Sequence, residues 1–167
     1  MSNTYHATPY DVSASGFYFT DYEEYLAKAK NHKNDYGDII DEVEIQFIDG
    51  DNYQLFNALG INQVNLEQWF NRFEQLDGDD LIKTVYLAEY TGEDMSDILD
   101  KLDDVCLFEG TSTEYAEEYI NDCGLLSELP EHLHYYFDVE AFARDMVLSG
   151  DITEVEIMNA HYIVWGH

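Results

Sequence analysis

Acidic residues recur one helical turn apart along this chain, and almost no basic residue compensates them. Glu114, Glu118 and Asp122 follow one another at intervals of four, and Asp100 and Asp104 repeat the interval. On an ordinary helix a glutamate is often followed four residues later by lysine. Like charges at this spacing cost about 0.2–0.5 kcal/mol per pair. One solvated acidic face is unremarkable, but the pattern repeats in every third of the chain.

The acidity is spread evenly and is not confined to a tail. Residues 1–55 hold 11 acids and 3 bases, residues 56–110 hold 13 and 3, and residues 111–167 hold 12 and 1, which together make the net charge of −29. Self-repulsion of this size destabilises a compact state. Duplex DNA carries one charge per ~1.7 Å of axis, so −29 corresponds to ~49 Å of duplex. These numbers permit a protein that imitates DNA.

The apolar content indicates a folded protein, because disordered acidic segments lack aromatic residues. Apolar residues make up 46% of the chain and aromatic residues 15%. No run approaches 18 apolar residues, and the start has neither a basic region nor an apolar one, so we expect no membrane span and no secretory signal. Cys106 and Cys123 suit a reducing cytoplasm, and their apolar surroundings predict that both are buried in the core.

Hydrophobic periodicity predicts an α+β protein with strands and helices at both ends and helices between them. In the first part we expect an extended segment at 16–20, a helix at 22–31 capped by Asp21, and a strand at 41–49. In the middle we expect a helix from 66 with a capping box formed by Asn65 and Gln68, a helix at 81–90 capped by Asp80, and a short helix around 95–102. In the last part we expect a strand or connector at 105–110, a helix that starts at a Thr111–Glu114 capping box and ends at Gly124, a helix from 139 capped by Asp138, and a strand or hairpin at 154–165.

Two segments resemble each other within the chain. Residues 18–45 and 136–157 both contain an aromatic pair, a capping aspartate, a helical pattern, Gly-Asp-Ile and then Glu-Val-Glu-Ile. Chance convergence on a strand–helix–strand pattern and a true structural repeat both explain the likeness. Such a chain could be elongated, with several small cores.

The sequence contains no convincing catalytic or cofactor motif. His132 and His134 are spaced as a ligand pair, but no third ligand stands nearby, which favours a surface pair over zinc. The segments 49–52 and 77–80 lack the spacing of a calcium loop and are better explained as turns. We therefore expect no enzyme activity, no metal and no cofactor. Two alternatives stay open: an acidic globular protein adapted to salt with an unrelated binding role, and a small enzyme or metal protein that uses His132, His134 or His161.

Residues 115–152 carry a more specific signal. It comprises Gly-Leu-Leu at 124–126, Leu-Pro-Glu at 129–131, Tyr-Phe-Asp at 136–138 and Glu-Ala-Phe-Ala-Arg-Asp-Met at 140–146. This run resembles the C-terminal region of the ArdA family of antirestriction proteins, and the length and acidity of the chain agree with the resemblance.

The resemblance implies a cytoplasmic protein of mobile genetic elements, without catalysis. Members of the family are elongated, curved homodimers of three small domains, which would here be an α+β domain at 1–61, a helical domain at 62–104 and an α+β domain at 105–167. Their carboxylates imitate DNA phosphates and occupy the DNA-binding groove of type I restriction–modification enzymes, so incoming DNA escapes cleavage. Such a protein would bind neither nucleic acid nor membrane.

Two sets of residues are expected to carry this function. The acids expected to imitate phosphates are Asp41, Glu42, Glu44, Glu67, Glu74, Asp79, Asp80, Glu93, Asp97, Asp100, Asp104, Glu114, Glu117, Glu118 and Asp122. The resemblance also implies an antirestriction motif at 124–148. The residues that it assigns to packing and the dimer interface of this motif are Leu125, Leu126, Leu133, Tyr136, Phe137 and Phe142.

Overall fold

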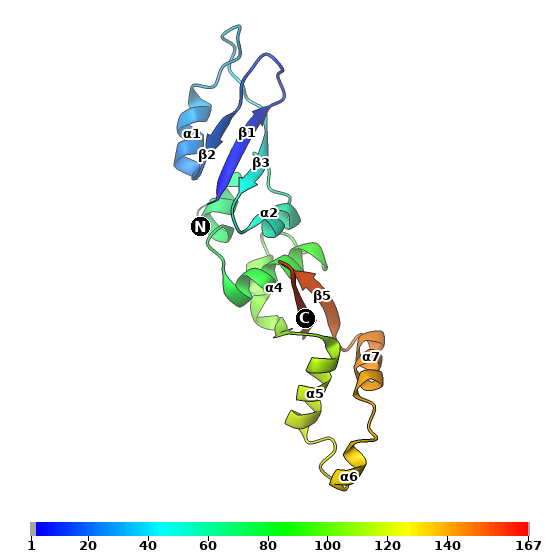
Figure 1. The fold of residues 1–167 in the computed structure, drawn as a ribbon. Helices are drawn as coiled ribbons and strands as arrows, with labels where there is room; N and C mark the ends of the chain where they lie inside the picture. The colour runs from blue at the N-terminus through cyan, green and yellow to red at the C-terminus, as the bar shows by residue number, and fades with distance from the viewer. Residues whose placement is uncertain (1–2, 167) are drawn as a thin grey trace. The chain divides into compact units, whose positions relative to one another are not determined.

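The protein consists of two compact units, each with a small antiparallel sheet and its own helices (Figure 1). A computed structural model describes residues 3–166. Unit 1 covers Met1–Leu81 and unit 2 covers Ile82–His167. The expected α+β class is confirmed. The three-domain array with boundaries after residues 61 and 104 stays a prediction.

The sheet of unit 1 is built around a strand that the sequence did not predict. Strand β1 (Thr4–Pro9) pairs antiparallel with β2 (Phe17–Phe19) on one side and β3 (Val43–Asp49) on the other. Tyr5 and Ala7 of β1 are fully buried. On β3, Val43 and Ile45 are buried and Glu44 is exposed, so the predicted alternation of this strand is confirmed.

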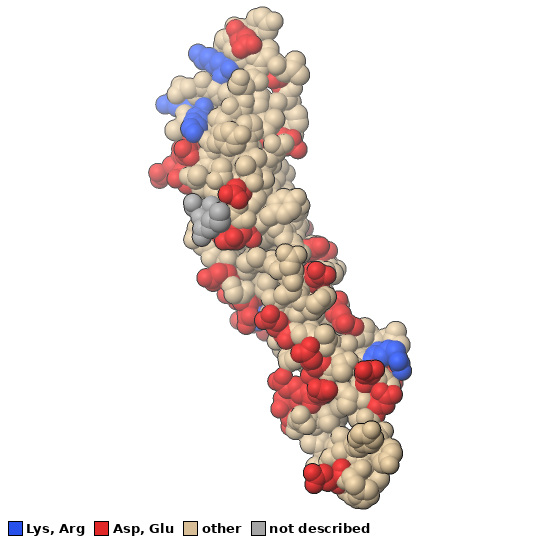
Figure 2. All heavy atoms as spheres, in the orientation of Figure 1, with Lys and Arg blue, Asp and Glu red and all other residues tan. Residues whose placement is uncertain are grey.

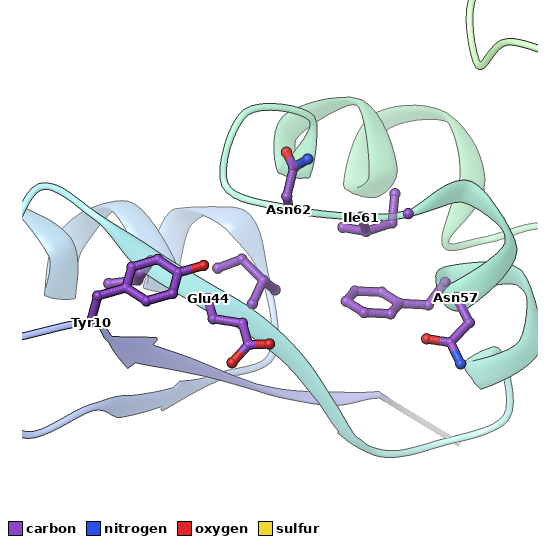
Figure 3. A pocket seen from close by; sticks show the side chains of 9 residues that line it. Tyr10, Glu44, Asn57, Ile61 and Asn62 are labelled. Carbon is purple, nitrogen blue, oxygen red and sulfur yellow. The ribbon is translucent and has the colours of Figure 1, made fainter.

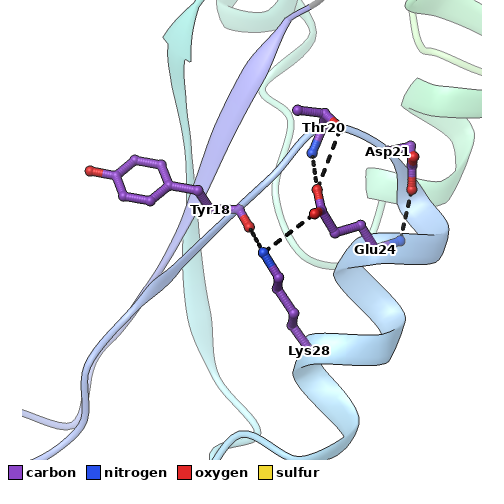
Figure 4. A network of polar contacts seen from close by, with 5 residues as sticks. All are labelled: Tyr18, Thr20, Asp21, Glu24 and Lys28. Carbon is purple, nitrogen blue, oxygen red and sulfur yellow. Dashed lines mark hydrogen bonds and ion pairs between the residues drawn. The ribbon is translucent and has the colours of Figure 1, made fainter.

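Helix α1 (Tyr22–Lys30) begins at a network of polar contacts (Figure 4). The Asp21 carboxylate accepts a 2.7 Å hydrogen bond from the Glu24 backbone N–H, which satisfies one of the free N–H groups of the first turn. The Glu24 carboxylate accepts from the Thr20 backbone N–H at 2.7 Å. Lys28 forms an ion pair with Glu24 at 3.4 Å and donates to the Tyr18 carbonyl at 2.7 Å. The cap predicted at Asp21 is confirmed.

The remaining helices of unit 1 close the core over this sheet. They are α2 (Tyr53–Leu59), α3 (Leu66–Gln68) and the π-helical turn η1 (Trp69–Phe73). Leu66, Trp69 and Phe73 are fully buried, as their helical spacing predicts. The capping box predicted for Asn65 is wrong, because its side chain makes no cap bond and instead accepts from the Asn62 backbone N–H at 2.7 Å.

Helix α4 (Gly78–Glu89) spans the boundary between the units, and the 3₁₀ helix η2 (Ile98–Asp104) follows it. The helix starts at Gly78, before Asp80, so the cap predicted at Asp80 is wrong. Asp79 and Asp80 lie in the first helical turn. Their negative charges are favourable there, because the helix dipole is positive at this end.

The sheet of unit 2 consists of β4 (Cys106–Glu109), β5 (Thr153–Ile157) and β6 (Ala160–Trp165), with β6 in the centre. Met158 and Asn159 join β5 to β6 and both have positive φ, 52° and 65°. Two such residues give a turn whose twist matches that of the strands. Residues 154–165 therefore form the hairpin that was one of the two expected structures.

Two longer helices of unit 2, α5 (Ser112–Cys123) and α7 (Val139–Ser149), pack on a shared core, and the short α6 (Glu131–His134) lies between them in sequence. The core contains Ala116, Ala143, Met146, Ile152 and Ile163. The predicted start and end of α5 and the predicted start of α7 are confirmed. A capping box at Thr111 and Glu114 starts α5, Gly124 at φ 61° ends it, and Asp138 accepts from the Ala141 N–H to start α7.

The internal resemblance corresponds only in part to shared structure. In unit 1 residues 17–19 form a strand directly before α1, whereas the element directly before α7 is the short helix α6. What the two segments share is a helix followed by an edge strand, β3 in one sheet and β5 in the other.

Both cysteines are exposed, so their predicted burial is wrong. Cys106 begins β4, which lies at the edge of its sheet. Cys123 is the last residue of α5, beyond the buried Ala116 and Ile120. Apolar neighbours in sequence do not bury a residue at the end of an element.

Candidate functional site

One face of α5 carries four exposed carboxylates and no basic residue. Glu114, Glu117, Glu118 and Asp122 are all exposed, while Ala116 and Ile120 on the opposite face are buried. A helix rises 1.5 Å per residue, so these four charges are distributed over ~12 Å of axis at an average interval of ~4 Å. One strand of B-DNA presents a phosphate every ~3.4 Å of axis. In Figure 2, acidic atoms gather over this helix.

The helix withstands this repulsion because its other contacts offset it. Glu114 closes the capping box, accepting from the Thr111 backbone N–H at 3.4 Å while the Thr111 hydroxyl accepts from the Glu114 N–H at 3.2 Å. Such a cap contributes typically about 1 kcal/mol. The rings of Tyr115 and Trp165 pack at a tilt of 49°, with centroids 4.8 Å apart. Together with the buried face, these contacts hold the charged face in place.

The other predicted acids lie on several elements, and all but Glu74 and Glu93 are exposed. In unit 1 they stand on and before β3 (Asp41, Glu42, Glu44), on α3 (Glu67), after η1 (Glu74) and in the first turn of α4 (Asp79, Asp80). In unit 2 they stand around η2 (Glu93, Asp97, Asp100, Asp104) and on α5.

Glu93 is paired with one of the few basic residues. Its carboxylate lies 2.5 Å from the Lys101 ammonium, and the hydrogen bond raises the pKa of Lys101 above its ordinary value. Asp97 and Asp104 add to the same effect through their charge. Glu93 is thus locally neutralised, in contrast to the acids of α5.

Glu74 serves the core of unit 1. It accepts a 2.6 Å hydrogen bond from the Tyr5 hydroxyl, whose oxygen accepts in turn from the Trp69 indole N–H at 2.8 Å. Tyr5 and Trp69 are both fully buried. A buried hydroxyl and indole need such partners, because an unsatisfied polar group in the interior costs about 1–3 kcal/mol.

A group of basic side chains lies on and just after α1. Lys28, Lys30 and Lys33 are three of the seven Lys and Arg residues of the chain. In Figure 2 blue atoms lie over α1 and the segment after it. Of these three, Lys28 is bound to Glu24 within its own helix.

Two exposed acids that the prediction missed lie on β5. Glu154 and Glu156 point away from the core, while Val155 and Ile157 between and after them are buried. The alternation Glu-Val-Glu-Ile, which identified Glu42 and Glu44, occurs here too. The same signal would have found them.

The segment between α5 and α7, which belongs to the expected antirestriction motif, exposes apolar side chains. Leu125, Leu133 and Tyr136 are 48%, 38% and 76% exposed. Leu126, Phe137 and Phe142 are half-buried, and the rings of Phe137 and Phe142 lie 5.7 Å apart. Neighbouring Leu129 and Tyr135 are also exposed. Exposed apolar clusters of this kind mark protein contact sites more often than scattered single residues do.

Residues 3–166 hold no group of three or more His, Cys, Asp or Glu side chains arranged to bind a metal ion. The ring of His134 is hydrogen-bonded to the Leu129 carbonyl at 3.0 Å. Among the same residues, no helix is long and apolar enough to cross a membrane.

The sequence model of one protein family, described as antirestriction protein (ArdA), matches residues 5–158. The chain belongs to the ArdA family. No curated protein and no solved structure matches it significantly. The match covers nearly the whole chain, well beyond the C-terminal run that carried the resemblance, and therefore includes both units of this ArdA protein. Membership of the family supports an antirestriction function.

Proposed function

We propose that this protein inhibits type I restriction–modification enzymes by occupying their DNA-binding groove with carboxylates in place of phosphates. The observation that carries the proposal is the α5 face, where Glu114, Glu117, Glu118 and Asp122 lie at nearly the spacing of phosphates on one DNA strand. These four acids take no part in the ion pairs described within residues 3–166. The protein acts by binding alone, and the enzyme stays intact.

The average charge density of the protein surface is lower than that of duplex DNA. Mimicry of DNA therefore requires that the carboxylates cluster locally. The chain exposes 10267 Å², which gives one net charge per about 350 Å². A duplex of about 10 Å radius with one charge per ~1.7 Å of axis has one per about 110 Å². Only faces such as that of α5, where carboxylates are concentrated and bases are absent, approach the density that an enzyme's Lys and Arg residues recognise.

The proposed mode of binding predicts broad inhibition. Sequence is read from base edges in the grooves, and phosphate contacts carry no sequence information. A carboxylate surface competes for the phosphate contacts only. Enzymes with different recognition sequences should therefore be inhibited alike, and the net charge of −29 should keep the protein itself from binding DNA.

We further propose that the protein acts as a cytoplasmic homodimer through the exposed apolar residues of the antirestriction motif. Leu125, Leu133 and Tyr136 would be covered by a second copy. Two copies carry charge equivalent to ~98 Å of duplex axis at ~1.7 Å per charge. That length suits an enzyme that recognises a long, two-part site.

The test is the plating efficiency of unmodified phage on cells with a type I restriction system, with and without the protein. We expect its expression to restore plating, and absence of rescue despite confirmed expression would refute the proposed function. With purified components, the protein should displace DNA from the enzyme competitively. Binding should weaken steeply as salt is raised, because association between opposite charges is screened.

A further inference from the structure

The open edge of β3 borders a hollow of about 350 Å³ (Figure 3). Strand β3 is an edge strand, since the order in its sheet is β2-β1-β3. This volume lies at the small end of the range of about 300–1,000 Å³ that ligand sites occupy. The residues that line it are Tyr10, Val43, Glu44, Ile45, Phe56, Asn57, Gly60, Ile61 and Asn62.

The lining combines an apolar base with a polar and aromatic rim. Val43, Ile45, Phe56 and Ile61 are each less than 10% exposed and present only part of their surface to the hollow. Tyr10, by contrast, is 66% exposed. Figure 3 shows its ring beside Glu44, with Asn57 on the far side of the hollow.

The carboxylate of Glu44, which lines the hollow, can accept further hydrogen bonds. The bond that its carboxylate accepts is one of 3.2 Å, from the Gln46 side-chain amide. Neither of the ion pairs between side chains described in residues 3–166, Lys28–Glu24 and Lys101–Glu93, involves it. A carboxylate beside an exposed aromatic ring and above an apolar base is suited to a cation that carries an aliphatic stem.

We propose that this hollow binds the side chain of an arginine supplied by the protein partner. The guanidinium group pairs with the Glu44 carboxylate and stacks on the Tyr10 ring, while its methylene stem packs on Val43 and Ile45. Arginine fits better than lysine because its planar group can both donate two parallel hydrogen bonds and stack on a ring. The choice of partner rests on the proposed function, since a DNA-binding groove presents arginines.

The same sequence element lines a second hollow in unit 2. Strand β5 is the edge strand of the β4-β6-β5 sheet and repeats Glu-Val-Glu-Ile. Beside it lies a hollow of about 200 Å³ whose lining includes Glu154, Glu156 and Tyr90. Tyr90 is 47% exposed, and its hydroxyl donates to the Glu156 carbonyl at 3.3 Å. An acidic edge strand with a tyrosine beside it therefore occurs once in each unit.

The direct test titrates the full chain with N-acetyl-arginine amide and follows backbone amide shifts. We expect saturable shifts centred on Glu44, Asn57 and Ile61 and binding in the millimolar range. N-acetyl-citrulline amide, which has nearly the same shape without the charge, should bind at least about fivefold more weakly. Equal binding of the two probes, or shifts spread over all exposed acids, would overturn the proposal.

Variants separate a specific site from general attraction by a negative surface. Glu44→Gln should weaken binding of the arginine probe by about fivefold or more. Glu23→Gln is the matched control, because Glu23 is exposed in the same unit, does not line the hollow and is not among the acids expected to imitate phosphates. Tyr10→Ala should weaken binding about two- to fivefold, and Tyr10→Phe should leave it unchanged, because the ring provides the stacking. Equal losses of probe binding in Glu44→Gln and Glu23→Gln would show only general attraction by negative charge and reject the site.

The two proposals fail in different experiments. If the protein inhibits the restriction enzyme but the arginine probe does not bind, the hollow is no arginine site and the proposed function stands. If the probe binds and the protein gives no protection from restriction, the function is wrong while the site remains. Where both hold, Glu44→Gln should reduce affinity for the enzyme about fivefold, and Glu23→Gln should change it less than twofold.

Discussion

The Tyr5 hydroxyl donates a 2.6 Å hydrogen bond to the Glu74 carboxylate, although 69 positions separate the two residues in sequence. Tyr5 lies on the central strand of the first sheet, and Glu74 follows the π-helical turn that buries Trp69 and Phe73. The bond ties the sheet to the helical layer. It also assigns one of the many acids to folding instead of to the acidic surface.

Replacing Tyr5 by phenylalanine should destabilise unit 1. The change leaves the Trp69 indole N–H and the half-buried Glu74 carboxylate without their shared partner, at a cost of about 1–3 kcal/mol. The measurement is the free energy of unfolding from urea denaturation at neutral pH. Tyr10→Phe is the control, since Tyr10 is 66% exposed and should change stability by less than about 0.5 kcal/mol. Equal stability of the two variants would contradict the structural role of the bond.

Stability should also fall at alkaline pH. Burial, followed by the hydrogen bond to Glu74, raises the pKa of Tyr5 above its ordinary value, and burial raises the pKa values of Tyr25 and Tyr86 as well. In the unfolded state these hydroxyls lose their protons near pH ~10, before those of the folded state do. The contribution of these tyrosines to folding stability is therefore complete below that pH and is lost as the pH rises toward their raised folded-state pKa values. The urea midpoint should decline above pH ~10, and less steeply in Tyr5→Phe. A midpoint that stays constant to pH ~11 would contradict this.

Neutralising the α5 face should weaken inhibition more than the same charge change elsewhere in unit 2. We expect the triple variant Glu117→Gln, Glu118→Gln and Asp122→Asn to lose about tenfold or more in affinity for the restriction enzyme, whereas Glu118→Gln alone should lose less than about threefold. The measurement is competition with labelled DNA at fixed salt.

The matched control for this triple variant is Glu140→Gln, Asp145→Asn and Asp151→Asn, which removes three exposed charges on and just after α7. The α5 variant should be slightly more stable than the unmodified protein, because each removed pair of like charges relieves about 0.2–0.5 kcal/mol. Loss of inhibition therefore could not be attributed to unfolding. If both triple variants lose affinity for the restriction enzyme equally, the total charge determines binding and the α5 face has no special role.

Charges placed in the apolar segment should prevent self-association. Leu133→Glu combined with Tyr136→Glu puts two carboxylates where the proposed interface excludes water, so a dimer should dissociate to monomers. Sedimentation velocity of the unmodified and changed proteins at equal concentration measures this. Leu148→Glu, at a side chain 76% exposed on α7, is the control and should leave the sedimentation coefficient unchanged. A monomeric unmodified protein at tens of micromolar would refute the proposed homodimer.

The sequence was sufficient to predict a helix end where the residues that form the cap lie within a few positions of each other. The capping box at Thr111 and Glu114 and the caps at Asp21 and Asp138 all occur as predicted, because cap bonds reach only three residues along the chain. Asn65 shows the limit of this signal. A nearby turn provided its side chain with a competing local partner, Asn62.

The sequence by itself determined the unneutralised charge, the helical faces that display it and the alternation that turns Glu44 outward. These depend on residue type and on periods of two or 3.6 residues, which act within one element. Tertiary structure alone decided that Thr4–Pro9 is the central strand, that Cys106 and Cys123 are exposed, that Glu74 bonds Tyr5, and that Glu44 and Tyr10 border one hollow. Each of these depends on segments far apart in sequence coming together, and pairing between distant strands and helices leaves no periodic trace in either partner.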